Sequence, residues 1–328
     1  MGVNLTEATG ATGAAAAELP LGGTCWARRW MLPAAWASLA ANVLIVVTGA
    51  VVRLTGSGLG CPTWPHCTGG SFVPHRALGI HGEIEFGNRL VTFLLAAVAI
   101  ATLLVAWRLG RGSLLRLAII LALGVPAQAV IGGISVLTDL NPWVVSLHLL
   151  VSMAMVGVSV VLLHRVTDGD GPSRPLVSRG VVWLTRAVFL AGWAVLYVGT
   201  VVTGSGPHAG AASAPRNGLD PEALSQLHTD VVFLLVGLTV AAVLVLRLAE
   251  APAGARAAAT ALLVVEVIQG AVGFAQYFTG LPVGLVIVHL LGAALVSAAV
   301  TWLLVSVHSR APEAQGSQAP VVSRSAAG

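Results

Sequence analysis

Eight long apolar runs, almost free of charged residues, alternate with shorter polar segments along the chain. Each run is roughly 20 residues long, which is enough for a helix to cross about 30 Å of hydrocarbon. A helix is required there because backbone polar groups find no water with which to pair. The pattern therefore predicts an all-α polytopic membrane protein with eight transmembrane helices, at about residues 33–53, 83–107, 115–136, 143–164, 181–203, 224–247, 257–278 and 283–307.

These runs contain an internal repeat, in which several residues recur 141 positions further along the chain without a gap. The first copies are Gln128, Gly132, Thr138, Leu140, His148, Leu149 and Leu150, and the second copies are Gln269, Gly273, Thr279, Leu281, His289, Leu290 and Leu291. Residues 49–58, which leave the first span, are similar to residues 199–206, which leave the fifth. Each half then has four spans, and an even number means that both halves enter the membrane from the same side. We expect two four-helix bundles related as a parallel repeat.

Composition and charge agree with this prediction. The chain is 56% hydrophobic and only 9% charged, whereas soluble domains are about 25% charged. Thirteen of the seventeen basic residues, all arginines, lie on the side of the membrane that holds both termini: Arg28, Arg29, Arg108, Arg111, Arg116, Arg165, Arg174, Arg179, Arg186, Arg247, Arg256, Arg310 and Arg324. Because positive loops stay inside, the N and C termini are predicted to be cytoplasmic. No basic patch is interleaved with aromatic residues, so we expect no nucleic-acid binding.

The predicted spans divide the chain into five parts. Residues 1–32 are Ala- and Gly-rich and lack the basic start of a secretory signal, so they are predicted to be a disordered cytoplasmic tail. Residues 33–164 form the first bundle, with an outer loop at 54–82 that contains two cysteines. A cytoplasmic linker at 165–180 leads to the second bundle at 181–308, and a cytoplasmic tail follows at 309–328.

Three histidines lie inside the predicted spans at one depth, about 6–9 Å below the outer helix ends. They are His148, His228 and His289. Histidine within a membrane is a functional candidate because a polar imidazole needs a partner there; the alternative is a hydrogen bond between helices. His228 and His289 could supply both axial nitrogens to a haem iron, whereas zinc or copper would require further Cys, Asp or Glu ligands at the same depth.

The first half differs at the position that matches His228. Asn88 stands there, and asparagine is a poor haem ligand. His81 lies two helical turns earlier, and it could bind only if its helix begins early. The predicted site around His148 is therefore five-coordinate or differently occupied.

The chain resembles the haem A synthase family in three features. These are Val52-Arg53-Leu54-Thr55-Gly56-Ser57-Gly58 followed by Cys61-Pro62-Thr63-Trp64-Pro65-His66-Cys67, the segment Glu85-x-x-x-Arg89, and the three span histidines. The resemblance covers about residues 35–308. It implies a cell-membrane oxidoreductase that oxidises a methyl group of haem O to a formyl group, giving haem A for terminal oxidase assembly.

The resemblance also implies roles for the histidines. His228 and His289 would be the axial ligands of a haem b, and His148 would hold the substrate haem. The family usually has Glu-x-x-His-Arg on the second span, so this chain departs from the pattern at Asn88.

Two groups of residues near the outer side of the membrane each have more than one possible role. Glu85 is a candidate catalytic residue for proton delivery or positioning, and the alternative is a structural ion pair with Arg89 or Arg53. The two arginines could instead hold the haem propionates. Cys61 and Cys67 share one outer loop, where oxidising conditions permit a disulfide, either structural or redox-active.

The expected partners are haem O, a haem O synthase, an electron donor and membrane lipid, and a homo-oligomer is left open. The alternative function is a membrane cytochrome that transfers electrons through bis-histidine haem b, and the loss of a ligand at Asn88 argues against it. A transporter is disfavoured because there is no chain of charges within the membrane. Glu266, in the middle of the seventh span, has no obvious partner and receives no role.

Overall fold

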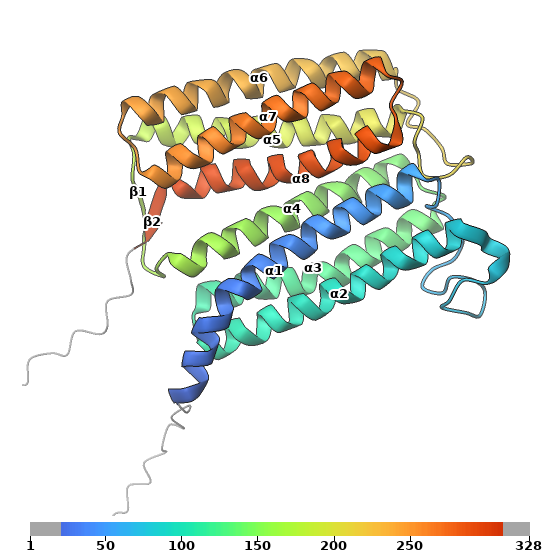
Figure 1. Cartoon of the computed structure of the whole chain (residues 1–328), viewed down its shortest axis with the longest axis horizontal. Helices are drawn as coiled ribbons and strands as arrows, with labels where there is room; N and C mark the ends of the chain where they lie inside the picture. The colour runs from blue at the N-terminus through green and yellow to red at the C-terminus, as the bar shows by residue number, and fades with distance from the viewer. Residues whose placement is uncertain (1–20, 311–328) are drawn as a thin grey trace, which may run out of the picture.

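The computed structural model describes residues 21–310, with side chains from Cys25 onward. Eight long helices account for most of them (Figure 1). They are α1 (Leu21–Leu54), α2 (Gly79–Leu109), α3 (Gly112–Leu137), α4 (Pro142–Thr167), α5 (Arg179–Ser205), α6 (Pro221–Leu248), α7 (Ala253–Phe278) and α8 (Val283–Ser306). Each is long and apolar enough to cross a membrane, so the prediction of an all-α multi-pass membrane protein is confirmed.

The helices form two sets of four, which Figure 1 shows as two groups. In the first set α1 and α3 each pack against both α2 and α4, and in the second set α5 and α7 each pack against both α6 and α8. Consequently α2 stands diagonally across from α4, and α6 from α8. The two sets meet where α8 packs on α1 and α4, and where α4 packs on α5.

Small residues allow the two sets to approach closely. Between the sets, a Cβ at Gly157 of α4 would lie 3.1 Å from Oγ1 of Thr301 on α8. Within the second set, a Cβ at Gly192 of α5 would lie 2.8 Å from Val300 of α8. The hydroxyl of Ser297 also donates a 2.8 Å hydrogen bond to the carbonyl oxygen of Met153. Small residues and interhelical hydrogen bonds are the usual means of association in a membrane, where lipid removes most of the hydrophobic driving force.

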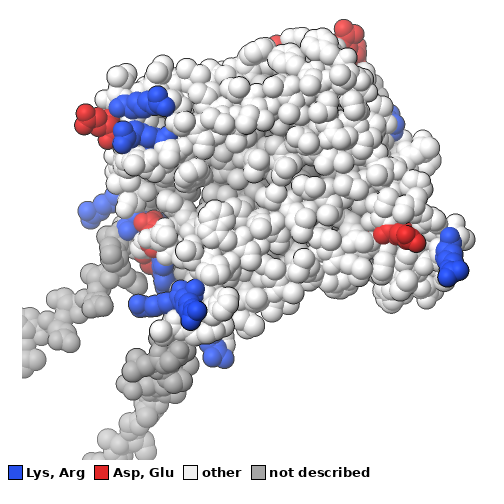
Figure 2. Space-filling view, in the orientation of Figure 1, with Lys and Arg blue, Asp and Glu red and all other residues white. Residues whose placement is uncertain are grey.

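Charged side chains gather at the two ends of the helices and leave a wide uncharged band between them (Figure 2). Large apolar side chains of the helices also face outward, among them Phe93, Leu190 and Phe233, which are 72%, 67% and 62% exposed. In water such exposure would be costly, at about 25 cal/mol per Å² of apolar surface. The band therefore matches a hydrocarbon environment.

The turns α3–α4 and α7–α8 adopt the same conformation. Leu140 and Leu281, which the repeat equates, have φ values of 61° and 60°. The N–H of each donates a 2.7 Å hydrogen bond to a carbonyl five residues earlier, that of Ser135 or Gln276. A left-handed leucine is uncommon, so its occurrence at both positions indicates that the two turns follow one structural plan.

The helix at the N-terminal end is longer than the apolar pattern predicts. Residues 21–32 belong to α1, so the prediction of a disordered tail up to residue 32 is wrong for this part, and residues 1–20 lie outside the described residues. The reason is packing, because Ala27 and Met31 are buried in a core cluster with Leu114 and Leu162. Pro33, at which the predicted span began, lies inside the helix.

The linker and the C-terminal end also contain structure beyond the expected loops. Strand β1 (Ser173–Pro175) pairs antiparallel with β2 (His308–Arg310), so residues 309 and 310 belong to a strand; residues 311–328 lie outside the described part. β2 and the start of α1 lie at the same end of the helices (Figure 1).

A polar cluster fastens the linker at this end. The Arg111 guanidinium donates to the Asp170 carboxylate at 2.8 Å and to the backbone carbonyls of Arg165, Val166 and Asp168. Ser113 adds a further hydrogen bond to Asp170. The hydrogen bond from Arg111 holds the pKa of the Asp170 carboxyl below its usual value.

Candidate functional site

The second set of helices places two histidines diagonally across its centre. His228 lies on α6 and His289 on α8, two helices that stand diagonally in this set. Each ring packs against a glycine of a neighbouring helix. A Cβ at Gly199 of α5 would lie 3.1 Å from Cε1 of His228, and one at Gly273 of α7 would lie 3.4 Å from Cε1 of His289. The glycines therefore provide the space that each imidazole occupies.

The first set repeats half of this arrangement. His148 lies on α4, and a Cβ at Gly132 of α3 would lie 3.2 Å from its Cε1 atom. Nε2 of Gln128 donates to the His148 carbonyl oxygen at 3.0 Å, as Nε2 of Gln269 donates to that of His289 at 2.6 Å. The glutamines, noticed in the sequence only as markers of the repeat, thus fix the helix turn that carries each histidine.

The three imidazoles have no protein partner at one nitrogen. Within residues 25–310, Nδ1 of His148, His228 and His289 is buried and forms no hydrogen bond. Leaving a buried polar atom unpaired costs about 1–3 kcal/mol, so a hydrogen bond between helices accounts for at most one of the two nitrogens of each imidazole.

The side chains of the second helix set match the ligand requirement of a haem. Among the described residues no three His, Cys, Asp or Glu side chains gather closely enough to hold a metal ion by themselves. A haem needs only two protein ligands, because the porphyrin supplies the others. The imidazoles of His228 and His289, cradled by glycines on diagonal helices, fit this requirement.

Asn88 occupies the corresponding place in the first set. Its Oδ1 accepts a 2.7 Å hydrogen bond from Oγ1 of Thr48 on α1. Gly49, the counterpart of Gly199, has open space beside it, since a Cβ there would meet no atom within 4 Å. His81 lies in the first turn of α2, but its Nδ1 is bonded to Oγ of Ser57 at 2.9 Å.

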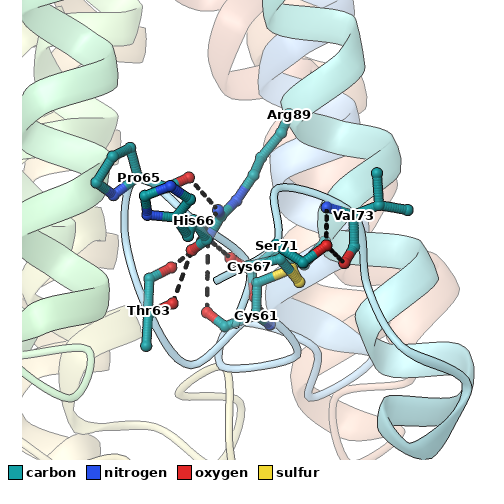
Figure 3. Close-up of a disulfide and its surroundings, with 9 residues drawn as sticks. Cys61, Thr63, Pro65, His66, Cys67, Ser71, Val73 and Arg89 are labelled. Carbon is teal, nitrogen blue, oxygen red and sulfur yellow. Dashed lines mark hydrogen bonds and ion pairs between the residues drawn. A yellow bond between two sulfur atoms is a disulfide. The ribbon is translucent and has the colours of Figure 1, made fainter. Parts of the chain in front are cut away.

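The carboxylate of Glu85 is buried beneath the outer loop, with 6% of the residue exposed. Its Oε2 accepts a 2.7 Å hydrogen bond from the Cys61 N–H, and its Oε1 pairs with Arg89 at 2.7 Å. Arg89 also donates to the carbonyl oxygens of Cys61, Thr63, Pro65 and His66 (Figure 3). Glu85 therefore forms the structural ion pair that the sequence left open, and a catalytic role for it is still a prediction.

The predicted disulfide between Cys61 and Cys67 is confirmed (Figure 3). Both cysteines are 0% exposed, which shields the bond from thiols in solution and is typical of a structural disulfide. Trp64 of the same loop presses against Gly133 of α3, where even a methyl group would clash. The loop is thus seated on the outer end of the first helix set.

Arg53 joins the two helix sets. Its Nε donates to the carbonyl oxygen of His208 at 2.7 Å, and its NH2 group donates to that of Thr203 at 2.8 Å. Nε2 of His208 lies 3.0 Å from the carbonyl oxygen of Leu281. The contacts of Arg53 cross between the sequence halves, whereas that of His208 with Leu281 lies within the second half, and the residue pattern offered no signal for either.

Glu266 receives a partner that the sequence analysis missed. Its Oε1 accepts a 2.8 Å hydrogen bond from Thr239 of α6, while its Oε2 is buried without one in the described part of the chain. The corresponding position in the first set is Val125, which is also buried.

Two sets of four apolar helices carry histidines at matching places, and within residues 25–310 the Nδ1 atom of each has no hydrogen-bond partner. This arrangement defines a class of multi-pass membrane protein with histidines inside its helix bundles. The chain belongs to the COX15-CtaA family, described as cytochrome oxidase assembly protein, whose sequence profile it matches over residues 33–83 and 79–230. The match ends before α7 and α8, so His289 lies outside it.

The chain is also similar to curated proteins named Heme A synthase, which confirms the resemblance noted from its motifs. Over 176 residues it is 32% identical to that of Lysinibacillus sphaericus, covering 51% of this chain and 57% of the relative. Over 168 residues it is 33% identical to that of Halalkalibacterium halodurans, covering 49% and 55%. The matched part is thus little more than half the length of these relatives.

A second name occurs among the similar proteins. A Protoheme IX farnesyltransferase of Thermus thermophilus is 32% identical over 157 residues, which are 48% of this chain and 21% of that protein. A protein of the same name from Halobacterium salinarum is 31% identical over 133 residues, 39% of this chain and 29% of that protein.

Proposed function

We propose that this protein is a haem A synthase, which oxidises a methyl group of haem O to a formyl group and so supplies haem A for terminal oxidases. The proposal rests mainly on the difference between the two histidine sites. One site has two imidazoles on diagonal helices, and the other has His148 opposite Asn88. Family membership and the names of the relatives support the same reaction.

In the second helix set, His228 and His289 would be the axial ligands of a haem b. An iron with two imidazoles has no free coordination position, which suits electron transfer. Gly199 and Gly273 leave room for the two imidazoles, and Gln269 fixes the turn of α8 that carries His289.

In the first set, His148 would hold the iron of the substrate haem O. The haem supplies the redox chemistry, and the protein supplies position and electrostatics. Gln128 and Ser152 both donate to the His148 carbonyl oxygen and so fix this part of α4. Glu85, held by Cys61 and Arg89, would position or move a proton near the methyl group that is oxidised.

The arginines retain a proposed role toward the haem. Arg53 and Arg89 lie toward the outer ends of α1 and α2, where haem propionates would reach. A guanidinium fork pairs well with a carboxylate, and each arginine would then exchange a backbone carbonyl partner for a propionate.

The similar farnesyltransferases support the proposed partners. A segment like this chain occurs within longer proteins that carry that name, which suggests that the enzyme that makes haem O works beside this one. The proposal also includes an electron donor, cytoplasmic termini and a parallel relation between the two helix sets.

The test is to express the full chain with a haem O synthase in a host that lacks haem A, and then to chromatograph the extracted haems. Accumulation of haem A is expected. Unchanged haem O together with a b-type absorption spectrum would instead favour the bis-histidine electron-transfer cytochrome. A chain that binds no haem would contradict both functions.

Variants of the second site sharpen this test. His228→Ala and His289→Ala should each remove the stable haem b absorption. His75→Ala, at an exposed position in the outer loop, is the matched control and should leave that absorption unchanged.

A further inference from the structure

Asn88 is the point at which the two histidine sites differ. We propose that Asn88 leaves the iron face opposite His148 open to a small exogenous ligand, and that its amide N–H donates a hydrogen bond to this ligand. The inference rests on the proposed function in placing a haem in the first helix set.

The equivalence of Asn88 and His228 is visible in both sequence and structure. Phe93-Leu94-Leu95 follows Asn88 at the same spacing at which Phe233-Leu234-Leu235 follows His228. The phenylalanines of both strings are exposed, and Leu95 and Leu235 are both buried, at 7% and 2% exposure. The two helices therefore present the same faces, and Asn88 occupies the place of an axial histidine.

The neighbouring helix α1 keeps the glycine that leaves room for an imidazole at this position. In the second set Gly199 lies against His228, whereas the equivalent Gly49 has open space within 4 Å of a Cβ. The shorter asparagine side chain therefore does not fill the volume that a histidine would take. With a haem held by His148, this volume would be available to a ligand on the other face of the porphyrin.

A hydrogen bond fixes the direction of the asparagine amide. Oγ1 of Thr48 donates to Oδ1 of Asn88 at 2.7 Å, while within residues 25–310 the Nδ2 group donates to no other residue. In the second set the residue that matches Thr48 is Val198, which has no hydroxyl. The threonine is thus found only in the half that has the asparagine, and it leaves the two N–H donors of Asn88 available.

The helix turn that carries His148 has one more side-chain hydrogen bond than the turn that carries His289. The His148 carbonyl oxygen accepts hydrogen bonds from Gln128 and from Ser152. The second set keeps the glutamine, but Ala293 stands where Ser152 would be. One anchored imidazole opposite an open, donor-bearing face is the arrangement that lets a haem bind a diatomic ligand, because pocket polarity and hydrogen-bond donors control such binding.

Carbon monoxide is a suitable probe because it binds a reduced iron only at an open position. The full chain, purified and loaded with haem b and haem O, is reduced and titrated with carbon monoxide while absorption and the C–O stretching frequency are recorded. One carbon monoxide per chain is expected, with the spectrum of the His228–His289 haem unchanged.

Reciprocal exchanges between the two sites provide the matched variants. Asn88→His should restore a second imidazole and reduce carbon monoxide binding at least about tenfold. His228→Asn loses one of the two haem b ligands and should retain less haem b, and the haem b that remains should now bind carbon monoxide. Asn88→Leu should keep the face open but lose the donor, which shifts the C–O stretch.

Three outcomes would overturn the proposal: no carbon monoxide binding by the loaded wild-type chain, unchanged binding in Asn88→His, or a C–O stretch that is the same in Asn88→Leu and in the wild type. Haem A formation is measured separately on the same preparations. If the carbon monoxide results are as expected but no haem A is formed, the open site stands and the proposed synthase activity falls.

Discussion

The carboxylate of Glu85 accepts a 2.7 Å hydrogen bond from the backbone N–H of Cys61, one of the two cysteines of the buried disulfide. The best candidate for an acid–base residue is therefore held by the same loop that the disulfide closes. A change in the loop should act on Glu85, and a change in Glu85 should act on the loop.

Glu85→Gln separates the structural role of this residue from a catalytic one. The amide oxygen of glutamine can still accept from the Cys61 N–H, but the side chain can no longer take up or release a proton. We expect the loop to stay in place while haem A formation falls by about a hundredfold or more. The measurement is haem A per unit of haem b, beside protease accessibility of residues 61–73.

Glu85→Ala is the companion variant, and it should lose both the loop contact and the activity. If Glu85→Gln were as active as the wild type, proton transfer by Glu85 would be excluded and only its structural role would stand.

Removing the disulfide should release Glu85 and Arg89 together. In the double variant Cys61→Ser with Cys67→Ser, a disulfide no longer restricts the unfolded chain. The free energy of unfolding should therefore fall by about 2 kcal/mol. We expect faster cleavage of the loop by protease and reduced haem A formation. The control is Cys25→Ser, because Cys25 is a free and exposed cysteine. An equal reduction of haem A formation in this control would show that the effect does not come from the disulfide.

The role of the glycines beside the histidines can be tested by replacing one of them with alanine, which adds a single methyl group. In Gly199→Ala the new Cβ lies 3.1 Å from Cε1 of His228, so the imidazole must move. Crowding of this kind costs about 1 kcal/mol or more, which corresponds to roughly fivefold weaker retention of haem b. The measured quantity is the haem b content after purification.

The first helix set provides the matched control for this prediction. In Gly49→Ala the new Cβ meets no atom within 4 Å, and haem b content should be that of the wild type. A larger loss in Gly49→Ala than in Gly199→Ala would contradict the assignment of the haem b site to the second set.

The pairing of Arg111 with Asp170 should make stability depend on pH. The pKa of Asp170 is lowered in the folded protein, so the pairing stabilises fully above the unfolded pKa of about 4. Its contribution is lost as the pH falls through the lowered folded pKa. The difference in thermal stability between the wild type and Asp170→Asn should thus be constant near neutral pH and shrink below about pH 4. A difference that grows on acidification would contradict this prediction.

Much of the architecture follows from the sequence because its signals are local. The length of each apolar run predicts a membrane span, and a polar imidazole inside such a run is conspicuous wherever the helix packs. The repeat spacing further predicted the equivalence of His148 and His289, whose glutamine and glycine neighbours proved to match. By contrast, the predicted start of α1 was wrong. Ala27 and Met31 are helical because they are buried against other helices, and the apolar pattern of the sequence does not record this burial.

By itself, the sequence determined the eight spans, the three span histidines and the substitution at Asn88. Only the tertiary structure decided how the polar groups pair, since such pairing depends on which helices become neighbours and how far each is rotated. Thr48 and Asn88 are 40 positions apart, and Arg53 and the His208 carbonyl are 155 apart. Helical periodicity records the face on which a side chain lies, but the partner on that face is set by packing between segments distant in the chain.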